Sequence, residues 1–86
     1  MNKHEIAYPA RWEYRIFVES AMLDAARQIV GAILAEHDEH AELTDGDRSS
    51  SGKYLALRGR AEVRSKDEAE ALGRKLAAVP GVKFVL

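Results

Sequence analysis

Several residue types and patterns are missing from this chain of 86 residues, and the first of them is cysteine. Without a thiol the protein can form no disulfide, no thiolate nucleophile and no cysteine-based zinc site. No segment approaches the roughly 18 consecutive apolar residues of a membrane-spanning helix. The N-terminal stretch also has no apolar segment like that of an ordinary signal peptide. These absences predict a cytoplasmic protein with no membrane partner.

Neither sign of charge is in excess, because 13 Lys and Arg residues face 14 Asp and Glu residues, for a formal net charge of −1. Proteins that grip nucleic acid nonspecifically depend on an excess of Lys and Arg. The composition therefore argues against nucleic acid as the main partner, although it does not exclude a local basic patch.

Motifs of the common catalytic sites are also missing. There is no Gly-rich phosphate loop between a strand and a helix, and no G-x-S-x-G motif. The serines at 49–51 have no obvious His–carboxylate partner, and Ser-Gly runs are common in turns. The run from Glu36 to His40 holds two histidines, but a metal site usually needs a third and a fourth ligand from elsewhere, and the remaining histidine is His4. We therefore expect no enzyme activity, no cofactor and no metal site.

Two segments, 12–19 and 53–63, alternate between apolar and polar residues, as strands with one buried face do. In the first, the inner side consists of Trp12, Tyr14, Ile16 and Val18. In the second, the inner side consists of Leu55, Leu57, Gly59, Ala61 and Val63. Two weaker strands are expected at 41–49, where Asp45-Gly46-Asp47 can bulge the chain, and at 82–86.

Two helices are predicted between these strands. Ser20 is a plausible N-cap for a helix that ends near His37, and Met22 and Ile29 widen its apolar stripe. The second helix begins with a capping box in which Ser65 and Glu68 each satisfy a backbone N–H. Its apolar stripe contains Ala69, Leu72, Leu76 and Val79, and Glu70 and Arg74 can pair one turn apart on its surface.

The resulting order of elements is β-α-β-β-α-β, which predicts an α+β fold of the ferredoxin-like sandwich type. Such a fold has a four-stranded antiparallel sheet with two helices on one face. The strands at 12–19 and 53–63 would be central, and the weaker ones would lie at the edges. We expect an extended lead-in at 1–11 and a single domain at 12–86.

The uncovered face of this sheet carries the candidate binding site. Alternation directs Arg15 and Phe17 outward from one central strand, and Lys83 and Val85 outward from an edge. The candidate ligand- or partner-binding residues are Arg15, Phe17, Lys53, Tyr54, Arg58 and Arg60. Guanidinium groups bind carboxylates and phosphates, so an anionic ligand or an acidic protein surface fits this face. A solvated sheet face whose Arg stems cover apolar surface is the alternative.

RNA binding on the same face is a second hypothesis. The run from Gly52 to Leu57 superficially echoes the signature of RNA-recognition modules, which stack bases on aromatic residues of the central strands. Only Phe17 and Tyr54 are both aromatic and directed outward, so the pattern is half present.

The whole-chain pattern resembles the YbeD-like family of small bacterial proteins. The resemblance rests on Tyr8-Pro9 before a strand containing Tyr14-Arg15-Ile16, on Ser50-Ser51-Gly52-Lys53-Tyr54, and on the closing run from Val79 to Leu86. It implies a fold similar to the regulatory domain of phosphoglycerate dehydrogenase, an ACT-type module. ACT modules bind small ligands and usually act by pairing with another copy. They commonly carry a glycine in the turn after the first strand, whereas this chain has Val18-Glu19-Ser20-Ala21 there.

The function expected from these observations is that of a small, non-enzymatic regulatory or adaptor domain. It would bind a protein partner or a small anionic ligand through the open sheet face or an edge strand, and a weak homodimer is compatible with it. An RNA-binding module is the alternative.

Overall fold

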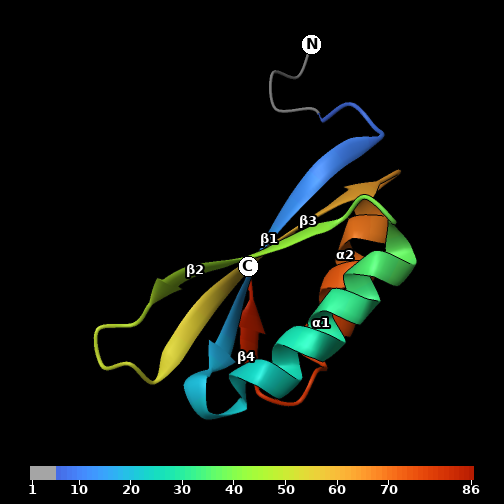
Figure 1. Cartoon of the computed structure of the whole chain (residues 1–86). Coiled ribbons are helices and arrows are strands. Elements are labelled where there is room, and N and C mark those ends of the chain that lie inside the picture. The colour runs from blue at the N-terminus through green and yellow to red at the C-terminus, as the bar shows by residue number, and fades with distance from the viewer. Residues whose placement is uncertain (1–5) are drawn as a thin grey trace.

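A computed structural model describes residues 6–86 and contains four strands and two helices in the predicted order (Figure 1). The elements are β1 (Ala10–Glu19), α1 (Leu23–His37), β2 (Glu42–Arg48), β3 (Tyr54–Val63), α2 (Lys66–Ala77) and β4 (Val82–Val85). His4 lies outside the described residues. Neither helix in the described part of the chain is long and apolar enough to cross a bilayer.

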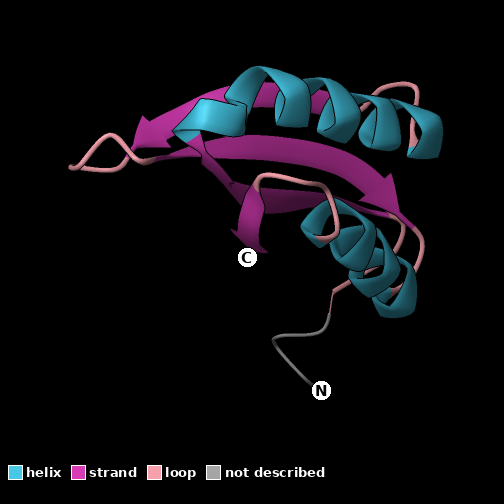
Figure 2. Ribbon diagram, turned by 90° about the horizontal axis from the view of Figure 1, so that it is seen from below, coloured by secondary structure: helices cyan, strands magenta, loops and turns pink. Residues whose placement is uncertain are grey.

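The strands form one antiparallel sheet in the order β2-β3-β1-β4. β1 and β3 are therefore central and β2 and β4 lie at the edges, as predicted. Both helices cover the same face of the sheet (Figure 1), and the long central strands curve and twist beneath them (Figure 2). The α+β, ferredoxin-like fold is confirmed, and the opposite face of the sheet stays open.

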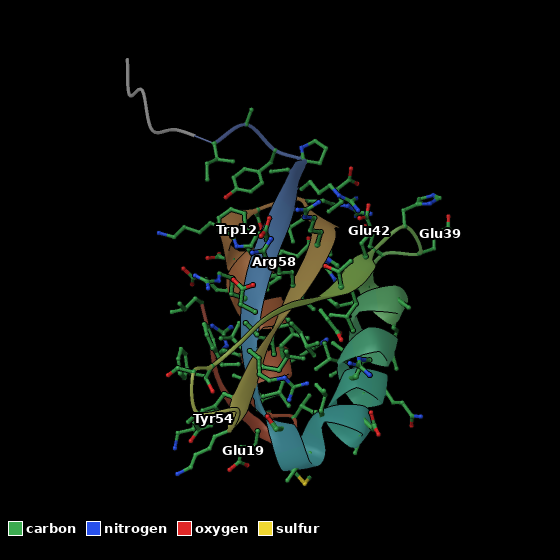
Figure 3. The ribbon with its side chains drawn as sticks, turned by 60° about the vertical axis from the view of Figure 1, so that its left-hand side comes forward. Trp12, Glu19, Glu39, Glu42, Tyr54 and Arg58 are labelled. Carbon is green, nitrogen blue, oxygen red and sulfur yellow. The ribbon has the colours of Figure 1, made fainter. Side chains whose placement is uncertain are left out.

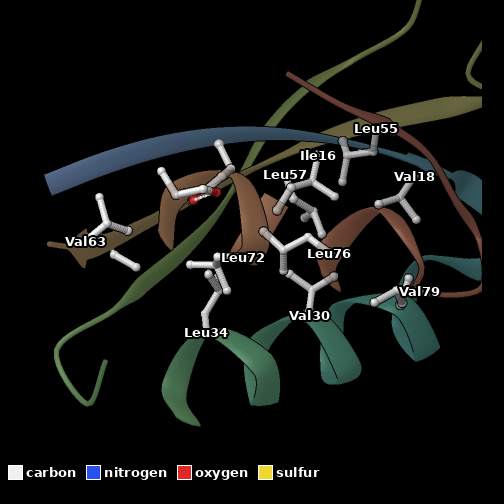
Figure 4. Packing of buried hydrophobic residues seen from close by; sticks show 14 residues of the cluster. Ile16, Val18, Val30, Leu34, Leu55, Leu57, Val63, Leu72, Leu76 and Val79 are labelled. Carbon is white, nitrogen blue, oxygen red and sulfur yellow. Dashed lines mark hydrogen bonds between the residues drawn. The ribbon is translucent and has the colours of Figure 1, made fainter. Parts of the chain in front are cut away.

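The core lies between the sheet and the helices (Figure 4). Inward residues of the central strands, such as Ile16 and Leu57, meet the apolar stripes of the helices, which include Val30 and Leu76, and all four side chains are fully buried. Leu57 and Leu72 belong to the same cluster, so the inner face of β3 is assigned correctly. Complete burial of each such side chain stabilises the fold by about 1.5–3 kcal/mol.

The two predicted helix starts have different outcomes. The Glu68 N–H donates to Ser65 Oγ at 3.0 Å, so Ser65 caps α2 as expected. The reciprocal bond of the capping box is not formed within residues 6–86, and the Glu68 carboxylate lies 3.1 Å from His37 Nε2 instead. Ser20 does not cap α1, because a short 3₁₀ turn at Ser20–Met22 precedes the helix. Ser20 Oγ donates instead to the Gly52 carbonyl at 2.6 Å, so a contact with the β2–β3 loop takes the place of the local cap.

Three surface predictions on the helices are wrong. Met22 and Ile29 are 37% and 43% exposed, so they lie at or beyond the edge of the buried stripe of α1. Glu70 and Arg74 form no ion pair within residues 6–86, and both line a groove beside β1.

The predicted irregularity in β2 is confirmed. Asp45 pairs with Leu57 and Arg48 with Leu55, so Gly46 and Asp47 together face Ala56. A Cβ on Gly46 would lie 2.5 Å from the Ala56 carbonyl oxygen, so a side chain there would force the two strands apart. The bulge brings the end of β2 over the open face.

Candidate binding site on the open sheet face

The pairing of β1 with β3 arranges the open face in rows across the two central strands. Glu13 lies opposite Arg60, Arg15 opposite Arg58, Phe17 opposite Ala56, and Glu19 opposite Tyr54. Figure 3 shows Trp12, Arg58 and Glu42 toward one end of the sheet, and Tyr54 and Glu19 at the other. The rows differ in charge and chemistry.

At the end of the face that carries the start of β1, positive and negative charges are balanced. Arg11 Nη2 lies 2.8 Å from Glu42 Oε1, and Arg60 Nε lies 3.3 Å from Glu13 Oε2. Arg60, one of the predicted site residues, is therefore neutralised by a carboxylate of the same face. It is less available to an external anion than its position alone indicates.

Arg15 and Arg58 form the next row, and this row is not balanced. Both side chains are exposed and stand on directly opposite residues of the central strands. Neither forms an ion pair with any carboxylate in the described part of the chain. Like charges directly opposite on adjacent strands destabilise a sheet, so we expect the pair to be unfavourable in the isolated protein. The two heads contact different neighbours, since the Arg15 guanidinium lies over the Phe17 ring and Arg58 Nε lies 3.4 Å from where a Cβ on Gly46 would be.

An aromatic pair lies beside these arginines. The rings of Phe17 and Phe84 stack with centroids 4.4 Å apart and planes inclined by 19°. The Arg15 guanidinium lies over the Phe17 ring, with its carbon 5.4 Å from the centroid. Such an arrangement combines a cation with an apolar surface that is accessible at Phe84, which is 47% exposed.

Phe84 is a site residue that the sequence did not predict, and the cause is a register shift in β4. Phe17 pairs with Phe84 and Val18 with Val82, so the residue between Phe84 and Val82 has no partner in β1. The expectation that Val85 points outward is wrong, because Val82 and Val85 both pack against the core and Phe84 faces out instead. Simple alternation along a short segment contains no signal for such a shift.

A small hollow of about 150 Å³ adjoins the Arg15–Phe17 pair. Besides these two residues it is lined by Tyr54 and Ala56 of β3 and by Asp47, Arg48 and Ser49. Although Ala56 points to the open face, it is only 5% exposed, because the bulged end of β2 lies over it. The hollow has the size of a side-chain group, well below the roughly 300–1,000 Å³ of pockets for whole small molecules.

Lys53 does not join this group. It precedes β3 and is exposed, and its carbonyl accepts the Ser20 N–H at 2.7 Å. Its neighbours in a separate hollow are Glu19, Ser20, Ala21 and Tyr54, so Tyr54 lines both hollows. The structure thus brings Arg15, Phe17, Tyr54 and Arg58 together on two strands and leaves Lys53 at the end of the sheet.

Two titratable groups with shifted pKa values lie away from this site. Burial, and to a smaller extent the charge of Glu68, raise the pKa of Tyr14 to about 12, and its hydroxyl donates to the Ala69 carbonyl at 2.6 Å. Hydrogen bonds from the backbone N–H groups of Glu62 and His40 lower the pKa of Asp38. Both groups connect elements of the fold.

The histidine-containing run also serves the fold. His37 Nε2 lies 3.0 Å from the Glu62 carbonyl and 3.1 Å from Glu68 Oε1, so it links the end of α1 to β3 and α2. Between residues 6 and 86, no group of three or more His, Cys, Asp or Glu side chains is placed to hold a metal ion.

Solved structures with the same fold share little sequence with this chain. The solution structure of a hypothetical protein from Helicobacter pylori matches with a TM-score of 0.72 and 19% identity, over 100% of this chain and 95% of that one. The C-terminal domain of the MgtC protein from Mycobacterium tuberculosis matches with a TM-score of 0.68 and 15% identity, over 95% of this chain and 88% of that one. At these identities the likeness shows the fold alone.

Two further comparisons concern the sequence. The chain is 31% identical over 81 residues to a UPF0250 protein of Shewanella amazonensis, and the match covers 94% of this chain and 90% of the relative. Residues 3–86 match the family described as "Protein of unknown function (DUF493)". The resemblance to YbeD-like small bacterial proteins is thereby confirmed, and the chain belongs to this family of unknown function.

Proposed function

We propose that this protein is a non-enzymatic, cytoplasmic adaptor or regulatory domain whose open sheet face binds an acidic segment of a protein partner. The observation that carries the proposal is the row formed by Arg15 and Arg58. Two exposed guanidinium groups stand on opposite residues, and no carboxylate within residues 6–86 forms an ion pair with either. An anionic group placed between them would remove their repulsion and accept charge-assisted hydrogen bonds from both.

The surroundings of the arginine row favour a protein segment over a small ligand. The hollow next to Arg15 is only about 150 Å³, and the rest of the site is an open surface. A carboxylate side chain has the size of this hollow, where it would meet Arg15 and Arg48 and would also approach the chain's own Asp47. An apolar neighbour in the same segment can cover the Phe17–Phe84 pair. A protein partner also supplies the extended contact area that a flat face needs for specific binding.

The use of this fold elsewhere supports the same proposal. The MgtC protein of Mycobacterium tuberculosis carries the fold as its C-terminal domain, that is, as one part of a larger protein. A regulatory role like that of ACT modules belongs to this proposal. The turn from Val18 to Ala21 has no glycine, so we do not place an amino-acid ligand there.

RNA binding is less well supported by the geometry of the aromatic residues. A base stacks on an accessible ring face. One face of the Phe17 ring is covered by Phe84, and the Arg15 guanidinium also lies over this ring. A base stacking on Phe17 would compete with these two contacts.

The test is an NMR titration of labelled protein with two probes, a synthetic peptide containing Asp, Glu and Phe, and a short single-stranded RNA. We expect the peptide to shift the resonances of residues 15, 17, 58 and 84, and to bind less tightly as salt rises. Arg58→Gln should weaken binding by about tenfold, the loss of roughly 1.4 kcal/mol of a charged hydrogen bond. Lys75→Gln, which removes the same charge on α2, should leave binding unchanged.

Two results would overturn the proposal. Shifts at Phe17 and Tyr54 with the RNA, and none with the peptide, would establish the RNA-binding alternative. No shift on the open face with either probe, at millimolar concentration, would leave this face as a solvated surface.

A further inference from the structure

The edge of β1 next to β4 is only half occupied. β4 is short, and its pairing with β1 covers Ile16–Val18, with Leu86 bonded to Arg15 beyond it. The Arg15 N–H donates to the Leu86 carbonyl at 3.1 Å, and the Leu86 N–H donates to the Arg15 carbonyl at 2.9 Å. From Ala10 to Tyr14, β1 has no strand partner on this side within the described residues.

The backbone groups that this edge presents follow from the alternation of an antiparallel strand. Successive residues direct their N–H and C=O groups to opposite neighbours. Since Arg15 bonds toward the β4 side, Arg11 and Glu13 direct their N–H and C=O groups to the same side, where the described chain supplies no partner strand. These groups are a template for an added strand.

A groove on the helix side of this edge can receive the side chains of an added strand. It has a volume of about 430 Å³, and its lining includes Trp12 and Tyr14 of β1, Gly73 and Ala77 of α2, and Leu86. Gly73 lies over the Tyr14 ring, where even a Cβ would be 3.4 Å from the ring carbon. The groove is therefore lined mainly by aromatic and small aliphatic groups, together with the charged side chains of Glu70 and Arg74.

We propose that the occupant of this edge is a second copy of the same chain, paired antiparallel through Ala10–Tyr14. Only Arg11 and Glu13 direct their N–H and C=O groups to the free edge. A register can therefore form hydrogen bonds only if it places each of them opposite Arg11 or Glu13 of the second copy. Pairing Arg11 with the second copy's Arg11 sets like charges together and puts Pro9, which has no N–H, opposite Glu13. Pairing Glu13 with the second copy's Glu13 again joins like charges and places Arg11 where Leu86 is already bound to Arg15.

The remaining register pairs Arg11 with the second copy's Glu13, and Glu13 with the second copy's Arg11. It is centred on Trp12 and ends with Ala10 opposite Tyr14. The next position, opposite Arg15, is occupied by Leu86, so the second copy's chain must leave the edge at the bend formed by Tyr8 and Pro9. On the open face, each cross-copy pair extends an existing ion pair, since Arg11 already contacts Glu42 and Glu13 already contacts Arg60. The result is two symmetry-related rows of alternating charge. Each row runs from Glu42 and Arg11 of one copy to Glu13 and Arg60 of the other.

This assembly goes beyond the acidic-partner site and is compatible with it. The two-fold axis would be perpendicular to the sheet, so both copies of the Arg15–Arg58 row lie on the same side of a continuous eight-stranded sheet. The two Trp12 rings meet on the helix side, where they fill the joined grooves. A contact of five residues from each strand is small, which predicts a weak and reversible dimer.

The test combines two single charge reversals with sedimentation equilibrium. Arg11→Glu leaves Glu at both 11 and 13, and Glu13→Arg leaves Arg at both, so each variant alone should associate at least tenfold more weakly than the wild type. An equimolar mixture should form a 1:1 heterodimer, because every cross-copy pair is again of opposite charge. Glu19→Arg, at the far end of β1, is the matched control and should dimerise like the wild type.

A measurement without substitutions accompanies this test. As the wild-type concentration rises, hydrogen exchange at the amides of Arg11 and Glu13 should slow, and the emission of the chain's single tryptophan, Trp12, should shift to the blue. A wild-type protein that stays monomeric at millimolar concentration would overturn the proposal. So would a dimer that tolerates both reversals, or a mixture of the two variants that forms no heterodimer.

Discussion

At the centre of the open face, the same substitution at two neighbouring arginines should have opposite effects. Arg58 faces Arg15 and is not balanced, whereas Arg60 is paired with Glu13. Arg58→Gln keeps most of the aliphatic stem and removes the repulsion, so it should stabilise the protein by about 0.2–1 kcal/mol at low salt. Arg60→Gln removes an exposed ion pair and should destabilise it by about 0–1 kcal/mol.

Urea unfolding at low and high salt measures both effects. Added salt screens the charges, so the gain from Arg58→Gln should shrink as salt rises. If Arg58→Gln were destabilising at low salt, favourable contacts of Arg58 would outweigh its repulsion with Arg15.

The buried phenol of Tyr14 should make the protein less stable at strongly alkaline pH. The pKa of Tyr14 is raised from 10.0 to about 12, mainly by burial and secondly by the charge of Glu68. The unfolded chain therefore releases this proton at a lower pH than the folded chain does. The stabilisation is complete below about pH 10 and is lost as pH rises toward 12.

The check is urea unfolding at a series of alkaline pH values. The free energy of unfolding of Tyr14→Phe should fall less steeply over this range than that of the wild type. Tyr54→Phe keeps the buried phenol and should follow the wild type. Equal slopes for Tyr14→Phe and the wild type would show that other groups cause the alkaline loss of stability.

Among the elements, the bulge in β2 depends on one residue without a side chain. A Cβ on Gly46 would stand 2.5 Å from the Ala56 carbonyl oxygen, while one on Gly31 of α1 would meet only Leu43 at 3.7 Å. Gly46→Ala should cost about 1–3 kcal/mol, because the strands must move apart. Gly31→Ala should be neutral or stabilise by up to about 1 kcal/mol, since Ala favours helix.

Thermal and urea unfolding of the two variants provide the comparison. The shifts at Tyr54 and Ala56 in NMR spectra of Gly46→Ala should show that the hollow beside Arg15 has changed. A Gly46→Ala protein with wild-type stability would mean that the bulge is not needed to bring β2 over the face.

The elements also show where reading the sequence succeeds and where it fails. Alternation assigned the faces of β1 and β3 correctly, because Tyr14, Ile16 and Leu57 follow a strict period of two along the unbroken pairing of these two strands. It failed at β4, where a register shift turns Val85 inward and Phe84 outward. The sequence predicted Arg15, Phe17, Tyr54 and Arg58 as outward residues, but not that Glu13 neutralises Arg60.

Ser20 illustrates a second kind of failure. Its position before an apolar helical stripe is typical of an N-cap, yet its hydroxyl donates to Gly52, which is 32 residues away in the chain. Local patterns cannot indicate such a partner, because it depends on how the β2–β3 loop folds back over the start of α1. The same limitation hides the half-occupied edge of β1.

Because the sheet and the helices share a single core, a substitution on either side of the core should destabilise the whole molecule. Leu57 on the sheet is fully buried and Leu72 on α2 is 3% exposed, and both belong to one cluster. Leu57→Ala or Leu72→Ala should each destabilise the protein by about 2–5 kcal/mol, with a single cooperative transition. Urea melts that show less than about 1 kcal/mol for both would contradict a shared core.

The central claim is that the Arg15–Arg58 row is kept, despite its repulsion, because it binds an acidic partner. The most direct test is the free energy of unfolding of the wild type and of Arg58→Gln, each with and without the acidic peptide. The wild type should be the less stable protein alone and should gain more stability from the peptide, because only ligands that bind the folded state stabilise it. If Arg58→Gln is the less stable protein alone and gains as much from the peptide as the wild type, the claim is contradicted.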